Sequence, residues 1–219
     1  MSAAAAGGET GAGAAGHAAA DRPRRPDLPE RPELPELPEL PDLPELPDLR
    51  ADCARCAGLC CMALAFDRGP MFAFDKPAGV ACRHLGADFR CRIHTGLAAR
   101  GFAGCVRFDC LGAGQRVVQD LFPGQDWRRD PGLARRMIEA FRALRELHRL
   151  IELLALAARL PLDPEQETAR RALLGELTAA AGWSEPALAA VLAGPLPRRV
   201  AGFLTGLRPA AETLRAPPR

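Results

Sequence analysis

The sequence predicts a mainly α-helical protein: a small, irregular, cysteine-rich metal-binding domain with little strand, a disordered N-terminal arm before it and α-helices after it. Three observations predict this class. All eight cysteines of the 219-residue chain lie between residues 53 and 110. A Pro-[Asp/Glu]-Leu repeat precedes them, and apolar residues at helical spacing follow them. We expect an arm over 1–50, a cysteine-cluster domain over 51–128, a long amphipathic helix packed on it over 129–160, and short helices over 162–219.

The arm has two parts. Residues 1–20 are mostly Ala and Gly, without a periodic apolar pattern, which predicts disorder. Over residues 26–49 proline recurs about every third residue, which excludes a helix and suits polyproline II. The repeat is interpreted as a stiff acidic spacer. The alternative is that its leucine edge docks on a protein partner.

The cysteines follow metal-ligand spacing. The first four read C-x2-C-x3-C-C, and the later ones stand in the segments Cys82-Arg83-His84, Cys91-Arg92-Ile93-His94 and Cys105 to Cys110. Zinc takes four thiolates or imidazoles in a tetrahedron, and a [4Fe–4S] cluster also takes four thiolates. The candidate ligands are all eight thiols: Cys53, Cys56, Cys60, Cys61, Cys82, Cys91, Cys105 and Cys110. They suit two four-ligand sites, or one site plus spare cysteines, with the neighbours Cys60 and Cys61 serving different sites or only one of them a ligand.

Other interpretations of the cysteines compete with metal. A disulfide framework needs an oxidising compartment, and residues 1–9 lack the features of a secretory signal, so a cytoplasmic location is expected. A redox C-x-x-C motif would accompany a βαβ pattern, which we do not find. Ordinary buried thiols do not account for the clustering. His84 and His94 either complete a mixed Cys/His site or are structural.

The ordered motifs resemble a known family. Cys53-x-x-Cys56-x-Gly58-x-Cys60-Cys61, Cys82-x-x-Leu85 and Cys91-x-Ile93-His94 are similar to the bacterial YkgJ cysteine-cluster family, described as zinc- or iron-chelating. The region from Leu49 to about residue 128 resembles more closely the cysteine-rich segment that precedes the repeats in some bacterial pentapeptide-repeat proteins. The likeness implies a zinc or iron–sulfur site. The chain departs from the second group because no tandem five-residue repeat follows the helix.

Between the cysteines the expected elements are short. Residues 71–74 and 89–93 predict two strands of a small hairpin, and residues 95–100 predict one helical turn before Gly101. Large apolar residues are few here, so bound metal is expected to contribute to folding.

After Cys110 the pattern becomes helical. A short helix is predicted over 114–122. Asp130-Pro131 then predicts the start of a long helix with the stripe Met137, Phe141, Leu144, Ile151 and Leu154, ended by Pro161. Further helices are predicted from Asp163-Pro164 to about Gly182, with Gln166 completing a capping box, from Ser184 to Gly194, and over 198–207. His148 and His17 are interpreted as incidental.

The charge distribution and the hydropathy argue against nucleic acid and membrane as partners. Residues 1–50 hold five Arg and ten acidic residues, so the remainder carries a net charge of +7 within the total of +2. Acids interleave with the arginines, which favours a solvated surface over a nucleic-acid interface. No apolar run approaches the ~20 residues of a membrane span.

The sequence therefore favours a non-catalytic, cytoplasmic metal-binding module holding zinc or a [4Fe–4S] cluster, with a structural, chelating or sensing role. A protein partner would use the proline-rich arm or the C-terminal helices. One alternative is an iron–sulfur enzyme or enzyme accessory, since flagellin lysine methylases carry a similar cysteine pattern. Another is a scaffold whose cysteines only stabilise the domain.

Overall fold

The computed structural model describes residues 45–178 and 182–215, with side chains described up to residue 212. Most of the expected disordered arm, residues 1–44, lies outside this part of the chain. Within it the expectation of a mainly helical protein with almost no strand is confirmed. The elements in chain order are η1 Cys53–Arg55, α1 Leu59–Ala63, η2 His94–Gly96, η3 Ala98–Arg100, α2 Ala103–Arg107, α3 Ala113–Arg116, the π-helical turn η4 Val117–Leu121, and the helices α4 to α8.

The two predicted strands, over residues 71–74 and 89–93, are wrong. In their place the described residues contain isolated antiparallel bridges, Phe66 with Lys76, Gly69 with Phe72, and Leu85 with Cys91. Phe89 has a φ of 62°, in the left-handed region, and this interrupts the extended backbone that a strand over 89–93 requires. The predicted turn before Gly101 is confirmed as η2 and η3.

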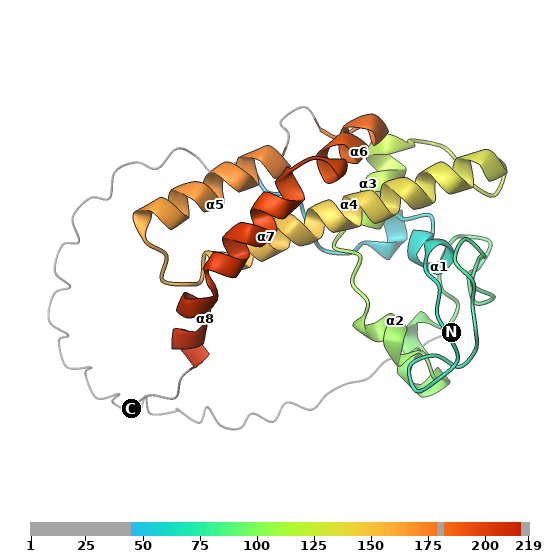
Figure 1. Cartoon of the computed structure of the whole chain (residues 1–219). Helices are drawn as coiled ribbons and strands as arrows, with labels where there is room; N and C mark the ends of the chain where they lie inside the picture. The colour runs from blue at the N-terminus through green and yellow to red at the C-terminus, as the bar shows by residue number, and fades with distance from the viewer. Residues whose placement is uncertain (1–44, 179–181, 216–219) are drawn as a thin grey trace, which may run out of the picture. The chain divides into compact units, whose positions relative to one another are not determined.

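Helix α4, Pro131–Ala157, is the central helix of the described residues (Figure 1). Asp130 caps it, because its Oδ1 accepts hydrogen bonds from the backbone N–H groups of Gly132 (2.8 Å) and Leu133 (3.2 Å), and Pro131 follows at the first helical position. The predicted apolar stripe is buried. This stripe packs against α1 and α3, as well as against the helices that follow.

The C-terminal helices are α5 Pro164–Leu177, α6 Glu185–Ala193, α7 Leu196–Gly206 and α8 Arg208–Arg215. The predicted capping box forms, since Asp163 accepts from Gln166 N–H (2.8 Å) and Gln166 Oε1 accepts from Asp163 N–H (3.1 Å). Helices α5, α6 and α7 all pack on α4. Their shared core includes Leu173, Leu174, Leu177, Leu188, Leu196 and Val200.

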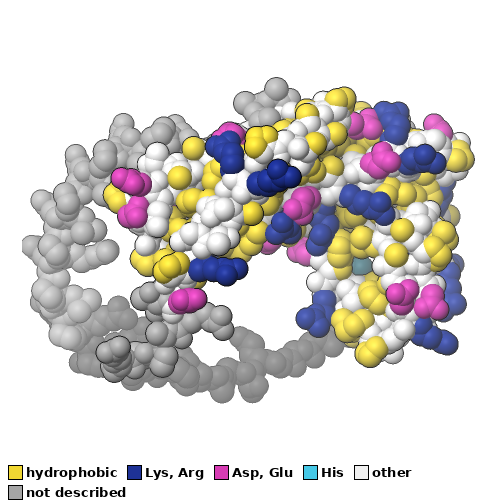
Figure 2. Space-filling model, in the orientation of Figure 1, with side chains coloured by type: hydrophobic (Ala, Val, Ile, Leu, Met, Phe, Trp, Pro, Cys, Tyr) yellow, Lys and Arg dark blue, Asp and Glu magenta, His cyan; other side chains and the backbone are white. Residues whose placement is uncertain are grey.

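The surface carries charges of both signs. Basic and acidic side chains are interspersed over the face in Figure 2, and some form ion pairs between helices, such as Arg136 with Glu185 and Arg199 with Glu176. No single helix in the described ranges is long and apolar enough to cross a membrane. Helices α6 and α7 reach that length and composition only as a pair bent by 50°.

Candidate metal centre

The first cysteine pair lies on a tight turn. Cys53 begins η1, where Asp52 accepts a hydrogen bond from the backbone N–H of Ala54 at 2.9 Å, and Cys56 directly follows that turn. The backbone N–H groups of Leu59 and Gly58 donate to the sulfur of Cys56. The buried indole N–H of Trp127 donates to the carbonyl of Ala57 at 2.9 Å, which anchors the turn to the core. The Cys56 sulfur is thereby held among donors that favour a thiolate.

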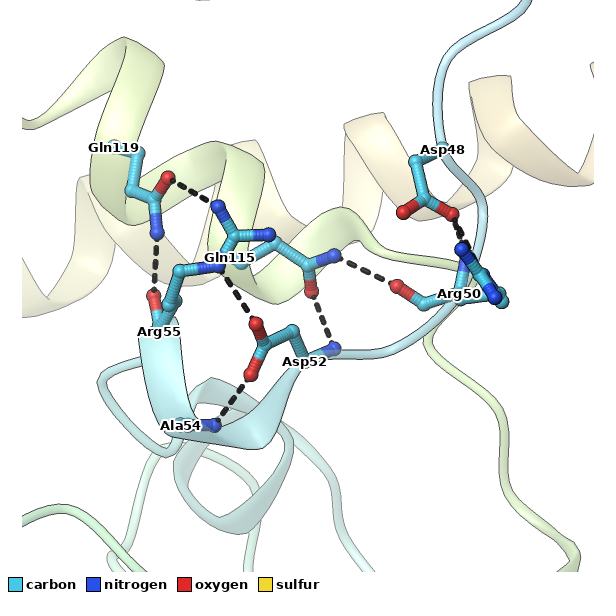
Figure 3. Close-up of polar contacts among 7 residues, drawn as sticks. All are labelled: Asp48, Arg50, Asp52, Ala54, Arg55, Gln115 and Gln119. Carbon is cyan, nitrogen blue, oxygen red and sulfur yellow. Dashed lines mark hydrogen bonds and ion pairs between the residues drawn. The ribbon is translucent and has the colours of Figure 1, made fainter.

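Gln115 on α3 fastens the segment that leads into this turn (Figure 3). The side chain is 4% exposed, its Oε1 accepts from Asp52 N–H (2.9 Å), and its Nε2 donates to the carbonyl of Arg50 (2.7 Å). Gln119, one helical turn further, makes only long contacts of 3.4 Å with Arg55. Gln115 thus joins the segment that precedes η1 to helix α3.

Helix α1 carries Cys60 and Cys61. Its N-cap, Gly58, has a φ of 65°, and a Cβ there would stand 2.6 Å from Leu85 Cδ1, so both backbone conformation and space require glycine. The two neighbouring thiols share a hydrogen bond, which together with burial raises the pKa of Cys60 far above its ordinary value. Cys60 therefore holds its proton until something displaces it.

The loops after α1 bring two more cysteines to it. Cys82 N–H donates to the carbonyl of Cys61 at 3.0 Å, and Cys91 forms a backbone bridge with Leu85. The N–H of Ile93 donates to the sulfur of Cys91. Backbone pairing therefore places Cys82 beside α1 and Cys91 beside Leu85, which itself packs against the N-cap of α1.

The last two cysteines, Cys105 and Cys110, come from the segment that precedes α3. Cys105 is on α2, and Cys110 lies between α2 and α3. The N–H groups of Gly114 and Gly112 donate to the Cys110 sulfur. Gly112 has a φ of 74°, and a Cβ there would stand 2.6 Å from the carbonyl oxygen of Asp48, so this turn also requires glycine.

Several of the thiols interact electrostatically with Cys60, but the thiols do not share one point. A charge on Cys60 raises the pKa of Cys53, Cys56, Cys91, Cys105 and Cys110, so Cys60 lies electrostatically at the centre of the group. All eight cysteines are free thiols, so none is paired in a disulfide. Over residues 45–178 and 182–215, no three His, Cys, Asp or Glu side chains are placed closely enough together to hold a metal ion.

Burial keeps most of these thiols protonated. It is the largest cause of the raised pKa of Cys53, Cys91 and Cys110, and it raises the pKa of Cys56 to about 12 and that of Cys105 to about 11. Thiolates are the metal-binding form of cysteine. A metal ion would therefore have to release protons as it binds, which makes its binding dependent on pH.

Comparison with known proteins finds a chain of similar sequence. The chain is 41% identical over 122 residues to the uncharacterized protein YybG of Bacillus subtilis (strain 168). The matched part covers 54% of this chain and 44% of YybG, so the chain spans less than half the length of that relative. No family model matches the chain, and no solved structure matches it.

The histidines differ from the expectation in one case. His84 packs beside the rings of Phe102 (5.3 Å between centroids) and Phe74 (5.7 Å), and His94 is exposed on η2. His148, interpreted as incidental, is 1% exposed, and its Nδ1 lies 2.5 Å from the carbonyl oxygen of Leu111. Because a carbonyl only accepts, Nδ1 carries the proton. The sequence signal was its place on the buried face of α4, between Leu147 and Ile151.

Sequence reasoning also missed Lys76. The interleaved charges predicted a solvated surface, but Lys76 is 4% exposed. The missed signal is its rarity, since Lys76 is the chain's sole lysine among 29 basic residues. Its ammonium group lies against backbone carbonyl oxygens instead of in solvent.

Proposed function

We propose that this chain is a metal-binding cysteine-cluster protein that holds zinc or iron–sulfur clusters through thiolates, in a structural, chelating or sensing role. The main support for this proposal is the set of backbone N–H groups that donate to cysteine sulfurs. Gly58 and Leu59 donate to Cys56, Gly112 and Gly114 donate to Cys110, and Ile93 donates to Cys91. Such donors lower the free energy of a thiolate relative to a thiol and commonly support metal-bound sulfur.

The donor set fits these metals. Thiolates are soft ligands, which favour zinc and iron–sulfur clusters over magnesium or calcium. The thiols are half-buried, apart from the exposed Cys53, so an ion can reach them from solvent. Protonated thiols do not repel one another, whereas thiolates do, and a bound cation removes that repulsion. Binding would therefore draw the sulfurs closer together than they are in the protonated chain.

The electrostatic effects and backbone contacts between the cysteines suggest that the eight thiols form two groups of four. Cys53 and Cys56 each respond to charge on Cys60 and Cys110. Cys105 responds to charge on Cys60 first and then to charge on Cys82 and Cys91, so Cys60 neighbours both groups, and Cys61 is joined to Cys82 through the backbone. We therefore assign one site to Cys53, Cys56, Cys60 and Cys110, and a second site to Cys61, Cys82, Cys91 and Cys105. This assignment gives the adjacent Cys60 and Cys61 to different sites.

The test is metal stoichiometry after anaerobic purification, with zinc and iron measured per chain alongside an absorbance spectrum. Colourless protein with two zinc ions per chain is expected for zinc, and absorption near ~400 nm for an iron–sulfur cluster. The variants Cys110→Ser and Cys105→Ser should each lose one equivalent, and the double variant should lose both. Wild-type protein free of both metals under these conditions overturns the proposal. Loss of both equivalents in each single variant overturns the division into two sites.

A further inference from the structure

The ammonium group of Lys76 is buried, and no carboxylate of the described residues pairs with it. A buried charge is costly unless it is paired or hydrogen-bonded. The partners of Lys76 Nζ are the carbonyl oxygens of Met62 (3.2 Å), Pro77 (3.0 Å) and Leu64. None of the ion pairs among the described residues includes Lys76. The three carbonyl oxygens carry no net charge, so a nearby negative charge would stabilise the buried ammonium further.

The hydrogen bonds keep the group charged. An ammonium has three N–H donors, and three carbonyl oxygens take them up. A neutral amine has only two N–H donors, so one carbonyl oxygen would face the nitrogen lone pair without a donor. The ring of Phe66, whose centroid is 5.7 Å from Nζ, adds a further contact that favours a cation. The geometry thus specifies a fixed positive charge.

This charge lies beside the thiols. Met62 lies in α1, the helix that carries Cys60 and Cys61, and Leu64 is the C-cap of that helix. Backbone hydrogen bonds between Phe66 and Lys76 (3.0 and 2.7 Å) close the loop that returns the lysine to α1. Burial lowers the pKa of Lys76, whereas negative charge on Cys82, Cys61 and Cys60 raises it, so these three sulfurs are its electrostatic neighbours.

We propose that Lys76 is the built-in counter-cation of the second proposed site, to which its neighbours Cys61 and Cys82 belong, and that this site is an all-thiolate, negatively charged complex. The inference rests on the proposed function. Four thiolates and one Zn²⁺ carry a net charge of −2, and four thiolates on a [4Fe–4S]²⁺ cluster carry the same charge. One buried ammonium offsets half of it in either case. A pair of disulfides or a site rich in neutral histidine would give the ammonium far less compensation.

The test compares Zn²⁺ affinity among variants by competition with a chromophoric zinc chelator. Lys76→Met should weaken Zn²⁺ binding by about tenfold or more, because a close cation no longer stabilises the thiolates. Lys76→Arg keeps the charge and should retain most of the affinity. Arg68→Gln removes an exposed positive charge from the same loop and should bind Zn²⁺ as tightly as wild type. Lys76→Gln, whose amide can still donate to a carbonyl, replaces Lys76→Met if circular dichroism shows that the methionine variant is unfolded.

The outcomes separate the two proposals. A wild-type chain that takes up neither zinc nor iron overturns the proposed function, and the role of Lys76 with it. A wild-type chain that binds Zn²⁺ while Lys76→Met binds it equally tightly overturns the role of Lys76 alone. Equal losses in Lys76→Met and Lys76→Arg would assign the effect to packing, and so would also overturn the counter-cation role.

Discussion

The sulfur of Cys56 lies directly against the backbone of Gly114, so closely that a Cβ on Gly114 would stand 2.6 Å from Cys56 Sγ. The same glycine donates its N–H to the sulfur of Cys110. Gly114 is therefore the residue at which two candidate ligands, far apart in sequence, approach each other. Only a residue without a side chain leaves room for both contacts.

Gly114→Ala should consequently displace Cys56. A new methyl group in a packed contact costs about 1–3 kcal/mol of unfolding free energy, and the shift should also lower the metal equivalent assigned to Cys56 and Cys110. Urea unfolding and metal analysis measure the two effects. Gly175→Ala is the control: Gly175 lies in α5, and a Cβ there would meet nothing within 4 Å, so alanine should stabilise the helix by up to about 1 kcal/mol. Unchanged stability and metal content in Gly114→Ala would contradict the prediction.

Local sequence signals predicted the helices well. Asp130-Pro131, Asp163 with Gln166, and Ser184 are N-terminal signatures whose partners lie within three residues, so no tertiary knowledge is needed to interpret them. The C-terminal ends of the helices were predicted less accurately than their starts. Helix α5 stops at Leu177, ahead of the predicted Gly182, and α8 was not predicted at all.

The candidate site could be predicted only as a list of residues. The clustering of cysteines is a feature of the sequence, but their neighbours are set by contacts across long separations, such as Cys82 with Cys61 and Gly114 with Cys56. The burial of Lys76 and His148 depends on carbonyl oxygens presented by distant backbone, which carries no sequence pattern. Phe89 shows the same limit, because its left-handed φ violates the preference of its residue type.

Gln115→Met should loosen the segment before the first cysteine pair. Methionine fills a similar volume but leaves the N–H of Asp52 and the carbonyl of Arg50 without their partner, at a cost of about 1–3 kcal/mol. Trypsin cleaves after arginine, so digestion at Arg50 and Arg55 should become faster. Gln119→Met is the matched control, since the contacts of Gln119 with Arg55 are long and exposed. Equal digestion rates for both variants and wild type would show that Gln115 does not hold this segment.

His148 should make stability depend on pH. Burial lowers the pKa of His148, and the nearby Arg116 lowers it further, against the hydrogen bond to the Leu111 carbonyl, which raises it. The unfolded chain has a histidine pKa near ~6.5 and therefore binds a proton at a higher pH than the folded chain does. The contribution of neutral His148 to stability is accordingly complete above about pH 6.5, and it is lost as the pH falls toward the lowered pKa of the folded state.

His148→Leu should remove both the hydrogen bond and this pH dependence. At pH 8 the variant should be less stable than wild type by about 1–3 kcal/mol, because the buried Leu111 carbonyl loses its donor. The gap should narrow at pH 5, where wild type has lost part of the contribution of His148. Urea unfolding midpoints between pH 5 and 8 measure it, with His94→Gln as a control for replacing a histidine at an exposed position. A constant gap across this range would mean that His148 does not titrate with folding, and that its burial matters only for packing.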